Sequence, residues 1–345
     1  MQRENFKGKY PYYGAQGVID YVAEYRCDGE YLLIAEDGEN LSSRKEPIAQ
    51  IAKGKFWVNN HAHIVKNNSK SDLCYICYLL NNSDITGYVT GAAQPKLSQA
   101  NLNKIVVNVP SLEIQHRIAS ILSAYDSLIE NNTKRIRLLE KMAENLYKEW
   151  FVRFRFPGYE KAEMENGLPK GWKHGSLSDI CEFKRGKNIT ASEMIAGNVP
   201  VISAGIEPSG FHNKANVKGV SITMSSSGAN AGYIAIHYSD IWAADCSFIN
   251  ETMTSYICYV YELLNNIRGV ITNFQRGAAQ PHVYPKDINR IKLIIPSERL
   301  RALADERLSV IHKQIDNLAK QNTLLARRRD LLLPRLMSGK LEVKP

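Results

Sequence analysis

The sequence Gly91-Ala92-Ala93-Gln94-Pro95 occurs a second time at Gly277–Pro281, an offset of 277 − 91 = 186 residues. The same offset continues downstream without a gap, pairing Leu102-Asn103-Lys104-Ile105 with Ile288-Asn289-Arg290-Ile291 and Pro110-Ser111 with Pro296-Ser297. Solenoids and propellers repeat every roughly 20 to 50 residues. The much longer period indicates a tandem duplication of a whole domain, and we expect its function to be carried out twice.

Upstream of the pentapeptide the two copies still correspond, although less closely. The matching positions are Pro11 with Pro200, Gly38 with Gly228, Trp57 with Trp242, and Tyr75-Ile76-Cys77-Tyr78 with Tyr256-Ile257-Cys258-Tyr259. The chain has 345 residues, of which 44% are hydrophobic, enough to fill two cores of ordinary size. Two domains are predicted.

The composition favours a polyanionic partner. The chain has 44 Lys and Arg against 35 Asp and Glu, a formal net charge of +9. A generally basic soluble protein is the alternative explanation. Neither a membrane-spanning apolar stretch nor the apolar core of a signal peptide is found. We expect a cytoplasmic protein without a membrane partner.

The six cysteines are scattered, which predicts reduced thiols and no disulfide framework. Cys74 and Cys77 form a CxxC motif downstream of His61 and His63, so a zinc site has to be considered. The second copy argues against it. There we align Ser255 with Cys74, Cys246 and Phe248 with His61 and His63, and Cys258 with Cys77. No metal site is expected.

A long amphipathic helix is predicted over residues 111–151, because apolar residues keep a spacing of three and four for over five heptads. Asn132 interrupts this apolar seam, and such a polar residue usually sets the register or the partner of a coiled coil. The helix has to end before Pro157. Its seam is expected at Ile118, Tyr125, Asn132, Leu139 and Leu146.

A second, more polar helix is predicted over residues 297–333, ending at Pro334. Its seam is expected at Leu303, Val310, Leu318 and Leu325, with Leu318 as the counterpart of Asn132. Arg327-Arg328-Arg329 is either a solvated face or a contact to nucleic acid or another subunit. We expect the two helices to pair as an antiparallel coiled coil that holds the globular domains apart; a coiled coil between two chains is the alternative.

Each globular domain has short β-rich runs and one helix-like run, which predicts a mixed α/β (α+β) fold with a curved sheet. The strands are expected at Tyr31–Ala35, Lys55–Val58, Ile105–Val109, Pro200–Ser203, Gly232–Ile236 and Arg290–Ile295, and the helices at Asp72–Leu80 and Met253–Leu264. The expected divisions are a first domain (1–110), the first helix (111–151), a crossover (152–167), a second domain (168–296), the second helix (297–333) and a tail (334–345).

The chain passes from the end of the first helix into the crossover through Trp150-Phe151-Val152-Arg153-Phe154-Arg155-Phe156-Pro157-Gly158-Tyr159. Its alternating Arg and Phe residues either stack on bases or dock the chain onto its own domain. The two domains also differ at their beginnings. Some thirty residues of the second domain precede Pro200, but only ten residues precede Pro11, so the first domain is predicted to lack an opening strand and the counterpart of the Lys184–Asn188 loop.

Polar, glycine-containing loops are the candidate contacts to DNA, since they offer side chains to base edges and phosphates. Ordinary turns are the alternative. In the second domain the candidates are Lys184, Arg185, Lys187, Asn188, Ser226, Asn230, Arg276, Gln280 and His282. In the first domain they are Tyr12, Tyr13, Gln16, Arg44, Lys45 and Lys96.

The sequence contains none of the common catalytic signatures considered below. The sequence contains no phosphate-binding glycine loop, no HExxH, no GxSxG, and no Asn-Pro-Pro-Phe or Asp-Pro-Pro-Tyr tetrapeptide of amino-methyltransferases. We therefore expect no catalysis by the chain itself and no bound cofactor.

The combination of features closely resembles the specificity subunit of Type I restriction-modification systems over essentially the whole chain. It comprises two α/β domains, each closed by a Gly-x-x-Gln-Pro turn and followed by a long helix. The accompanying motifs are Trp150–Gly158 and Leu168-Pro169-Lys170-Gly171-Trp172 at the crossover and Leu336-Met337-Ser338-Gly339-Lys340-Leu341 near the end.

The resemblance implies two target recognition domains that each read one half of an asymmetric bipartite site in double-stranded DNA, at a spacing set by an antiparallel coiled coil. It also implies two modification subunits, which carry S-adenosylmethionine and methylate adenine, and through them restriction subunits that use ATP and Mg. Two other functions remain as alternatives: a homodimeric scaffold without specific DNA readout, and a self-sufficient DNA-modifying enzyme.

Overall fold

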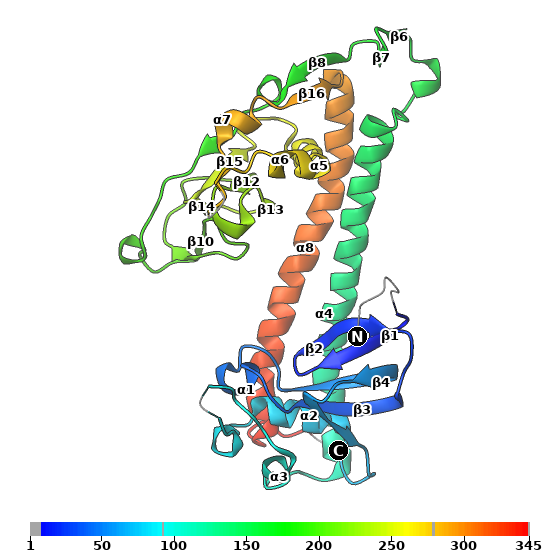
Figure 1. The fold of residues 1–345 in the computed structure, drawn as a ribbon, viewed down its shortest axis with the longest axis vertical. Coiled ribbons are helices and arrows are strands. Elements are labelled where there is room, and N and C mark those ends of the chain that lie inside the picture. The colour runs from blue at the N-terminus through cyan, green and yellow to red at the C-terminus, as the bar shows by residue number, and fades with distance from the viewer. Residues whose placement is uncertain (1–7, 92, 278–279, 344–345) are drawn as a thin grey trace. The chain divides into compact units, whose positions relative to one another are not determined.

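The computed structural model describes residues 8–91, 93–277 and 280–343 (Figure 1). It divides into two compact units, here called unit 1 (Met1–Asn131 with Gln321–Pro345) and unit 2 (Asn132–Lys320). Each unit consists of one α/β domain and a part of both long helices, α4 (Leu112–Tyr147) and α8 (Glu298–Met337). The duplication seen in the sequence is therefore a duplication of structure.

The domain of unit 1 is built on a five-stranded sheet in the order β2-β1-β4-β3-β5. β1 joins the end of β4 in parallel, and the other neighbours are antiparallel. The strands are β1 (Tyr10–Gly14), β2 (Gly17–Val22), β3 (Cys27–Ala35), β4 (Ala49–Val58) and β5 (Ala62–Lys66); the helices are α1 (Asn40–Ser43), α2 (Leu73–Asn82) and α3 (Gln99–Leu102).

The domain of unit 2 has a related arrangement of strands, but its strands are shorter and belong to separate sheets. One sheet has the order β13-β12-β15-β9, a second has β11-β10-β14, and β16 pairs with β8. The strands are β6 (Met164–Glu165), β7 (Leu168–Pro169), β8 (Lys173–Ser176), β9 (Lys184–Arg185), β10 (Val199–Ile202), β11 (Gly210–His212), β12 (Ser221–Ser225), β13 (Ile234–His237), β14 (Trp242–Ala243), β15 (Cys246–Asn250) and β16 (Lys292–Ile295). The domain's helices are α5 (Ile257–Asn266), α6 (Arg268–Thr272) and α7 (Pro285–Ile288).

The same parallel strand contact marks both domains. Tyr12 of β1 lies opposite Trp57 of β4, and Val201 of β10 lies opposite Trp242 of β14. This matches the sequence pairing of the two tryptophans. The domains differ because the single long strand β4 corresponds to two strands, β13 and β14, which join separate sheets of unit 2.

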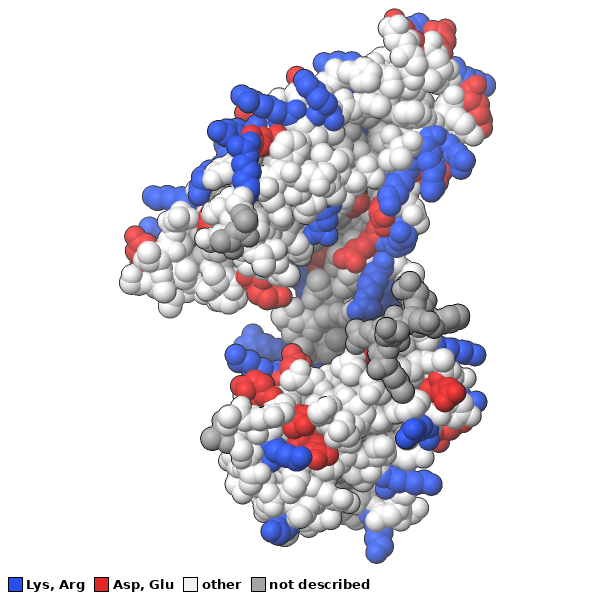
Figure 2. Space-filling view, in the orientation of Figure 1, with Lys and Arg blue, Asp and Glu red and all other residues white. Residues whose placement is uncertain are grey.

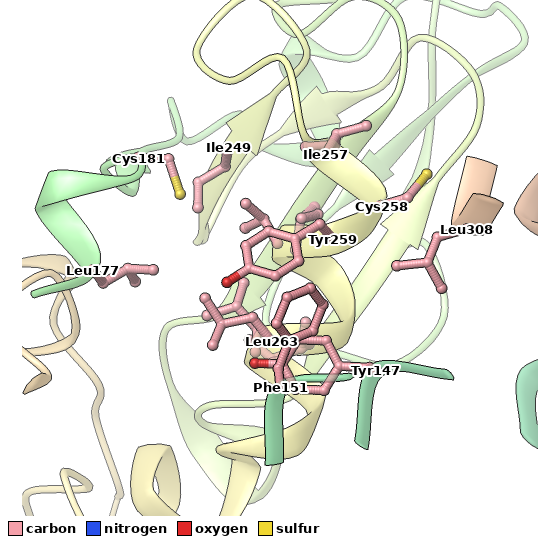
Figure 3. Packing of buried hydrophobic residues seen from close by; sticks show 14 of the residues in the cluster. Tyr147, Phe151, Leu177, Cys181, Ile249, Ile257, Cys258, Tyr259, Leu263 and Leu308 are labelled. Carbon is pink, nitrogen blue, oxygen red and sulfur yellow. The ribbon is translucent and has the colours of Figure 1, made fainter. Parts of the chain in front are cut away.

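One buried tyrosine anchors each domain helix. Tyr75 of α2 clusters with Ile118, Ala119 and Leu122 of α4, and Tyr259 of α5 lies in the core of unit 2 with Leu308 of α8. Figure 3 shows the ring of Tyr259 beside those of Tyr147 and Phe151, with ring centroids 5.8 and 5.0 Å away. Each domain is thus packed onto the long helix that follows it.

These two tyrosines correct the alignment made from the sequence. Both helices have ten residues and end in Leu-Leu-Asn-Asn, so Tyr75 corresponds to Tyr259, an offset of 184. The pairing of Tyr75 with Tyr256 was wrong by three positions, because both copies have two tyrosines three residues apart, Tyr75 and Tyr78 in the first and Tyr256 and Tyr259 in the second. Cys74, and not Cys77, is the counterpart of Cys258.

A polar contact at the next turn also repeats. Tyr78 of α2 donates a hydrogen bond to Asp126 of α4, and Glu262 of α5 lies 3.1 Å from Nε2 of His312 of α8. Asp126 and His312 are 186 residues apart, so the two contacts occupy equivalent positions with different chemistry. His312 and Glu262 are both buried, and Tyr238 contacts the other ring nitrogen of His312 at 2.8 Å. Burial of charged groups requires such pairing.

The two long helices run antiparallel where they pack within a unit. In unit 1, Asp126 pairs with Arg329 at 2.5 Å, and Asn322 donates to the carbonyl of Ile129. Arg329 is therefore engaged in an ion pair, whereas Arg327 and Arg328 are exposed. In unit 2, Arg307 of α8 lies over the ring of Trp150, which belongs to a π-helical turn (Lys148–Val152) after α4.

The prediction that the second helix ends at Pro334 was wrong, since α8 continues to Met337. Proline removes one backbone hydrogen bond from the helix. The extra turn instead buries Leu336, which packs with Tyr75 and Ile118 in unit 1. Burial of this side chain offsets the lost hydrogen bond.

The seam was predicted correctly in the first helix and in part of the second. Ile118, Asn132 and Leu318 are buried, and Tyr125, Leu139, Leu146, Leu303 and Leu325 are partly buried. Val310 was predicted wrongly, because its side chain is 57% exposed. The buried stripe follows Ala304, Leu308, Ile311, Ile315 and Leu318. Because Ala304 is a small residue, the apolar spacing in the sequence does not reveal this stripe. Both α4 and α5 pack against the stripe.

The crossover docks onto unit 2. The rings of Phe151, Phe154 and Phe156 lie 6.1, 5.3 and 5.5 Å from that of Trp172, between ring centroids. These aromatic side chains are used in packing, which favours the docking interpretation over base stacking.

The strand predicted at Ile105–Val109 is not formed in the described part of unit 1. Its counterpart in unit 2, β16, pairs along its whole length with β8. No described residue of unit 1 takes the place of β8. A strand of this kind needs a partner for its backbone groups, which explains why the same sequence pattern has different outcomes.

The corrected seam predicts unequal effects of two neighbouring substitutions in α8. Leu308→Ala should destabilise unit 2 by about 2–5 kcal/mol, because it removes a fully buried side chain. Val310→Ala, at an exposed position, should change stability by less than about 0.5 kcal/mol. Urea unfolding followed by circular dichroism measures both, and similar losses for the two variants would contradict the register.

Candidate nucleic-acid interface

The chain is closed into a small loop around the position of the repeated pentapeptide in each unit. Its base is closed by two backbone hydrogen bonds between Thr90 and Lys96 (2.9 and 2.7 Å), and by two between Arg276 and His282 (2.9 and 2.8 Å). We call these the closing loops. A further bond ties each to a glycine turn, from the Gly38 amide to the Pro95 carbonyl and from the Gly228 amide to the Pro281 carbonyl. The proposed correspondence of Gly38 and Gly228 is confirmed.

Glycine is required at the first position of both closing loops. Gly91 and Gly277 have φ values of +87° and +98°. A Cβ atom there would lie 2.3 Å from the carbonyl oxygen of Gln94 and 2.6 Å from that of Gln280. Both the backbone conformation and the close approach exclude a side chain. Ala92, Ala278 and Ala279 lie outside the described residues.

The two glutamines project from the loops. Gln94 and Gln280 are exposed, and within the described residues neither side chain makes a hydrogen bond. Backbone groups, not these amides, hold the loops closed. Gln280 therefore stays available as a donor and acceptor for a base edge.

In unit 2 the structure brings together three segments that contain the candidate residues of the second domain. Arg185 of β9 forms an ion pair with Asp245 (3.6 Å), and Ser227 donates to the same carboxylate at 2.7 Å. Ser227 is bridged by backbone to His282, which closes the loop with Arg276. The described parts of residues 184–188, 225–232 and 275–282 thus form one surface, here called the unit 2 loop cluster.

Both arginines of this cluster are held by an acid and still face solvent. Arg276 pairs with Asp287 at 2.9 Å, and the side chains of Arg185 and Arg276 are 59% and 63% exposed. An ion pair on one side of a guanidinium orients it and leaves further N–H donors free. Arginine in this state suits bidentate contact with phosphate or guanine.

The basic loop after β9 is fixed by close backbone contacts. The amides of Gly186 and Lys187 donate to the carbonyls of Cys246 and Ala243 at 2.8 and 2.9 Å. A Cβ on Gly186 would lie 2.5 Å from two backbone oxygens, so only glycine fits. Lys184, Lys187 and Asn188 are exposed around this fixed point.

The remaining candidates of unit 2 are less accessible. Ser226 is buried, and its carbonyl accepts a hydrogen bond from the Val283 amide. Asn230 is partly buried in the glycine turn, and His282 stacks on Tyr284 with ring centroids 6.2 Å apart. Ser226 therefore contributes to the shape of the cluster more than to its outer face.

Unit 1 has the same backbone arrangement with different charges. Asp37, at the position of Ser227, is bridged to Lys96, at the position of His282. Lys96 pairs with Glu36 at 3.2 Å, and His61 contacts Asp37 at 2.6 Å. The closing loop of unit 1 therefore lies beside two carboxylates, where unit 2 has hydroxyl groups.

The other candidates of unit 1 lie elsewhere. Arg44 donates to the carbonyls of Leu80, Asn81 and Ser83, which end α2, so its guanidinium has a structural partner. Tyr12 and Tyr13 lie in β1, with rings near Trp57 and Phe56; burial raises the pKa of Tyr13. Gln16, in the β1–β2 turn, and Lys45 are exposed. The structure does not gather these residues around the closing loop.

The sequence identified the cations of the interface but missed the acids that position them, Asp245 and Asp287. An acid next to a predicted loop has no distinctive spacing, although Asp245 follows the repeated tryptophan strand closely. The stacking partner Tyr284 was also missed. On the face drawn in Figure 2, Lys and Arg side chains are spread over each unit and mixed with Asp and Glu.

The cysteines take part in packing. Cys246 is fully buried, its thiol donates to the Ile202 carbonyl, and burial raises its pKa to about 12. Its counterpart in unit 1 is Ala62, since both lie at the start of the strand that pairs with β3 or β12. No group of three His, Cys, Asp or Glu suited to a metal ion occurs in the part of the chain that the structure describes. No described helix is long and apolar enough to cross a membrane.

A duplicated α/β domain, with a long helix after each copy and a loop cluster carrying oriented arginines, defines a class of nucleic-acid recognition proteins. Comparison with protein families agrees. Residues 2–141 and 169–327 match the type I restriction modification DNA specificity domain. The chain belongs to this family.

One similar protein covers nearly the whole chain and another about a third of it. The type I restriction enzyme MjaIX specificity subunit of Methanocaldococcus jannaschii is 27% identical over an alignment of 390 positions, gaps included, which spans 99% of this chain and 89% of that protein. A putative type I restriction enzyme specificity subunit of Haemophilus influenzae is 39% identical over 121 residues, or 35% of this chain and 31% of that protein.

The fold is also found in a solved structure, that of the type I restriction-modification S subunit from M. genitalium. The TM-score is 0.66 at 19% identity, and the match covers 96% of this chain and 89% of the other. The fold prediction, two similar α/β domains in tandem with long helices, is confirmed.

The geometry of the closing loop predicts that Gly277→Ala destabilises unit 2. The left-handed backbone and the close carbonyl oxygen should together cost about 1–3 kcal/mol. Gly269→Ala in α6 is the matched control, since no atom lies within 4 Å of its added Cβ and alanine favours helix. Urea unfolding of both variants provides the measurement, and equal stability of the two would show that the loop tolerates a side chain.

Proposed function

We propose that this chain is the DNA-recognition subunit of a type I restriction-modification complex, and that each unit reads one half of a bipartite site. The observation that carries the proposal is the closing loop, built twice with the same backbone bonds but different neighbours. Lys96, Glu36 and Asp37 surround it in unit 1, while Arg276, His282 and Ser227 surround it in unit 2. The same loop backbone with different neighbouring side chains in the two units suits recognition of two different half-sites.

Readout of DNA by unit 2 would use two kinds of contact. Lys184 and Lys187 are exposed beside the fixed Gly186 turn and suit phosphates, which position a protein without reading sequence. Arg185, Arg276 and Gln280 offer N–H donors or an amide to base edges in the major groove. The ion pairs to Asp245 and Asp287 reduce the freedom that both arginines lose on binding.

The spacing between the half-sites would come from α4 and α8. Each helix contains residues of both units, and 36 and 40 residues give lengths of about 54 and 60 Å at 1.5 Å per residue. Half-sites one DNA turn apart are separated by roughly 34–36 Å. Helices of this length suffice to set such a gap.

Catalysis would belong to partner subunits. The proposed complex contains two modification subunits, which bind S-adenosylmethionine and methylate adenine, and restriction subunits that use ATP and Mg. The similarity to specificity subunits supports this division of roles. The chain itself would contribute recognition and docking in the cytoplasm.

Methylome sequencing tests the proposal in cells that carry this chain with its modification subunits. We expect methylated adenines in a two-part motif with a fixed gap and two different halves. The double variant Arg185→Ala/Arg276→Ala should relax one half and leave the other intact, because both residues lie in unit 2. Each lost base contact should reduce discrimination by about 1–3 kcal/mol.

An uninterrupted motif, or loss of sequence preference in both halves, would contradict the assignment of one half-site to each unit. The purified chain alone, incubated with DNA and labelled S-adenosylmethionine, is the control for catalysis. Methyl transfer in that sample would show that the chain is an enzyme in its own right.

A salt titration separates DNA recognition from a scaffold role. Binding of the chain to random duplex should weaken steeply between 50 and 200 mM salt, since phosphate contacts release counterions. Lys184→Ala/Lys187→Ala should reduce the slope of log affinity against log salt by about 2. Lys170→Ala, an exposed lysine paired with Glu163 outside the loop cluster, should not change it. A chain without a salt slope would be a scaffold.

A further inference from the structure

One segment of unit 2, residues 168–188, covers two strand edges at once; we call it the opening segment. Its strand β8 pairs with β16 over four residues, and its strand β9 pairs with β15. Between them, the amides of Leu177 and Ser178 donate to the carbonyls of Ile291 and Asn289 at 3.1 and 3.0 Å. Leu177, Cys181 and Phe183 are buried in the core.

Unit 1 contains both of these edges. β5 matches β15, because Ile64 lies opposite Leu33 of β3 just as Phe248 lies opposite Thr223 of β12. Residues 106–109 match β16 at the offset of 186. Within the described residues, β5 is the last strand of its sheet and residues 106–109 form no strand pairing.

Apolar side chains are exposed along both edges of unit 1. Ile64 is 46%, Val106 86% and Val109 42% exposed, whereas Ile295, the counterpart of Val109, is only 2% exposed beneath β8. A cavity of 570 Å³ lies between Val109 and Pro110 on one side and residues 336–343 of the same unit on the other. An apolar edge with unpaired backbone groups accepts an additional strand readily.

A polar anchor of the opening segment is likewise left without its partner in unit 1. In unit 2, the Asn289 side chain accepts a hydrogen bond from the Phe183 amide at 2.9 Å and donates to the Phe183 carbonyl. Its counterpart Asn103 is exposed. Three features of the binding surface in unit 2 therefore recur uncovered in unit 1: a strand edge at residues 106–109, a second edge at β5, and this asparagine.

We propose that unit 1 binds an additional extended polypeptide segment with the pattern of the opening segment. Its first strand pairs antiparallel with residues 106–109, and apolar residues spaced like Leu177, Cys181 and Phe183 fill the core beside Ile105. Its second strand pairs with β5. The basic loop that follows then lies near Glu36, Asp37 and Lys96, where the described part of unit 1 has no counterpart of Lys184–Lys187.

Unit 2 shows what covers these edges, and its own copy of the segment is already in use there. The described residues contain no second copy of this segment, so the occupant of unit 1 is an additional segment of the same type. The inference rests on strand pairing and burial and does not depend on the proposed function, so the two can fail independently.

Hydrogen exchange measured by mass spectrometry on the full chain tests the proposal. The probe is a synthetic peptide of residues 168–188. The amides of residues 106–109 and the amides of β5 that face away from β3 should exchange rapidly in the chain alone, and about tenfold or more slowly once the peptide is bound. Amides of β16 should not change, since their partner strand is already present. Fluorescence anisotropy of the labelled peptide should saturate at one peptide per chain.

Two matched controls locate the binding surface. A peptide with serine in place of Leu177, Cys181 and Phe183 should not bind. Val106→Lys/Ile64→Lys in the chain should reduce affinity at least about tenfold, while Ile206→Lys, at another exposed apolar residue, should not. All three positions are exposed, so the variants are expected to fold.

Three results would overturn the proposal. Slow exchange of both edges in the chain alone would show that they are already covered. Absence of peptide binding would show that unit 1 has no acceptor surface of this type. Binding that slows exchange in unit 2, or that Val106→Lys/Ile64→Lys leaves unchanged, would place the peptide elsewhere.

Discussion

The structure depends on covering the apolar stripes of two long helices, which neither helix can bury by itself. In each unit the stripes meet each other and a short domain helix, whose tyrosine, Tyr75 or Tyr259, is the largest fully buried side chain of the contact. Burial of one large apolar side chain is worth roughly 1.5–3 kcal/mol. Because the same contact attaches the domain to its helix, it also positions the sheet and the loops at the sheet's edge.

The loops that concern function are fixed by backbone bonds rather than by their own side chains. The closing loop is held at its base and at one glycine turn in both units, and Gly186 lets the basic loop of unit 2 approach the backbone of Ala243 and Ala244. Side chains on such a frame can vary without disturbing it. This separation of frame and contact explains how one fold can present Arg276 and His282 in unit 2 but Thr90 and Lys96 in unit 1.

Much of the fold was predictable because it depends on short-range patterns. The exact offset of the pentapeptide identified the duplication, and heptad spacing identified both helices. The errors arose where distant residues decide. Val310 has the spacing of a seam residue but is exposed, since α5 and α4 together select the stripe through Ala304 and Leu308. Pro334 stays within α8 because Leu336 is buried by the domain of unit 1. Residues 105–109 form a strand pattern without a strand, because a strand requires a partner.

For the candidate interface too, some features follow from the sequence and others only from the folded structure. The sequence by itself determined that the domain is duplicated, that Gly91 and Gly277 recur, and that Lys184, Arg185, Lys187 and Arg276 lie next to glycines in polar segments, since repetition and composition are local properties of a chain. The structure places Lys184 and Arg185 in the short strand β9 instead of a loop. Only the tertiary structure decided which loops meet, that Asp245 and Asp287 hold the two arginines, and that Arg44 ends a helix instead. Such contacts join residues up to 60 positions apart, such as Arg185 and Asp245, and the free energy of burial and pairing that selects them exists only once the chain is folded.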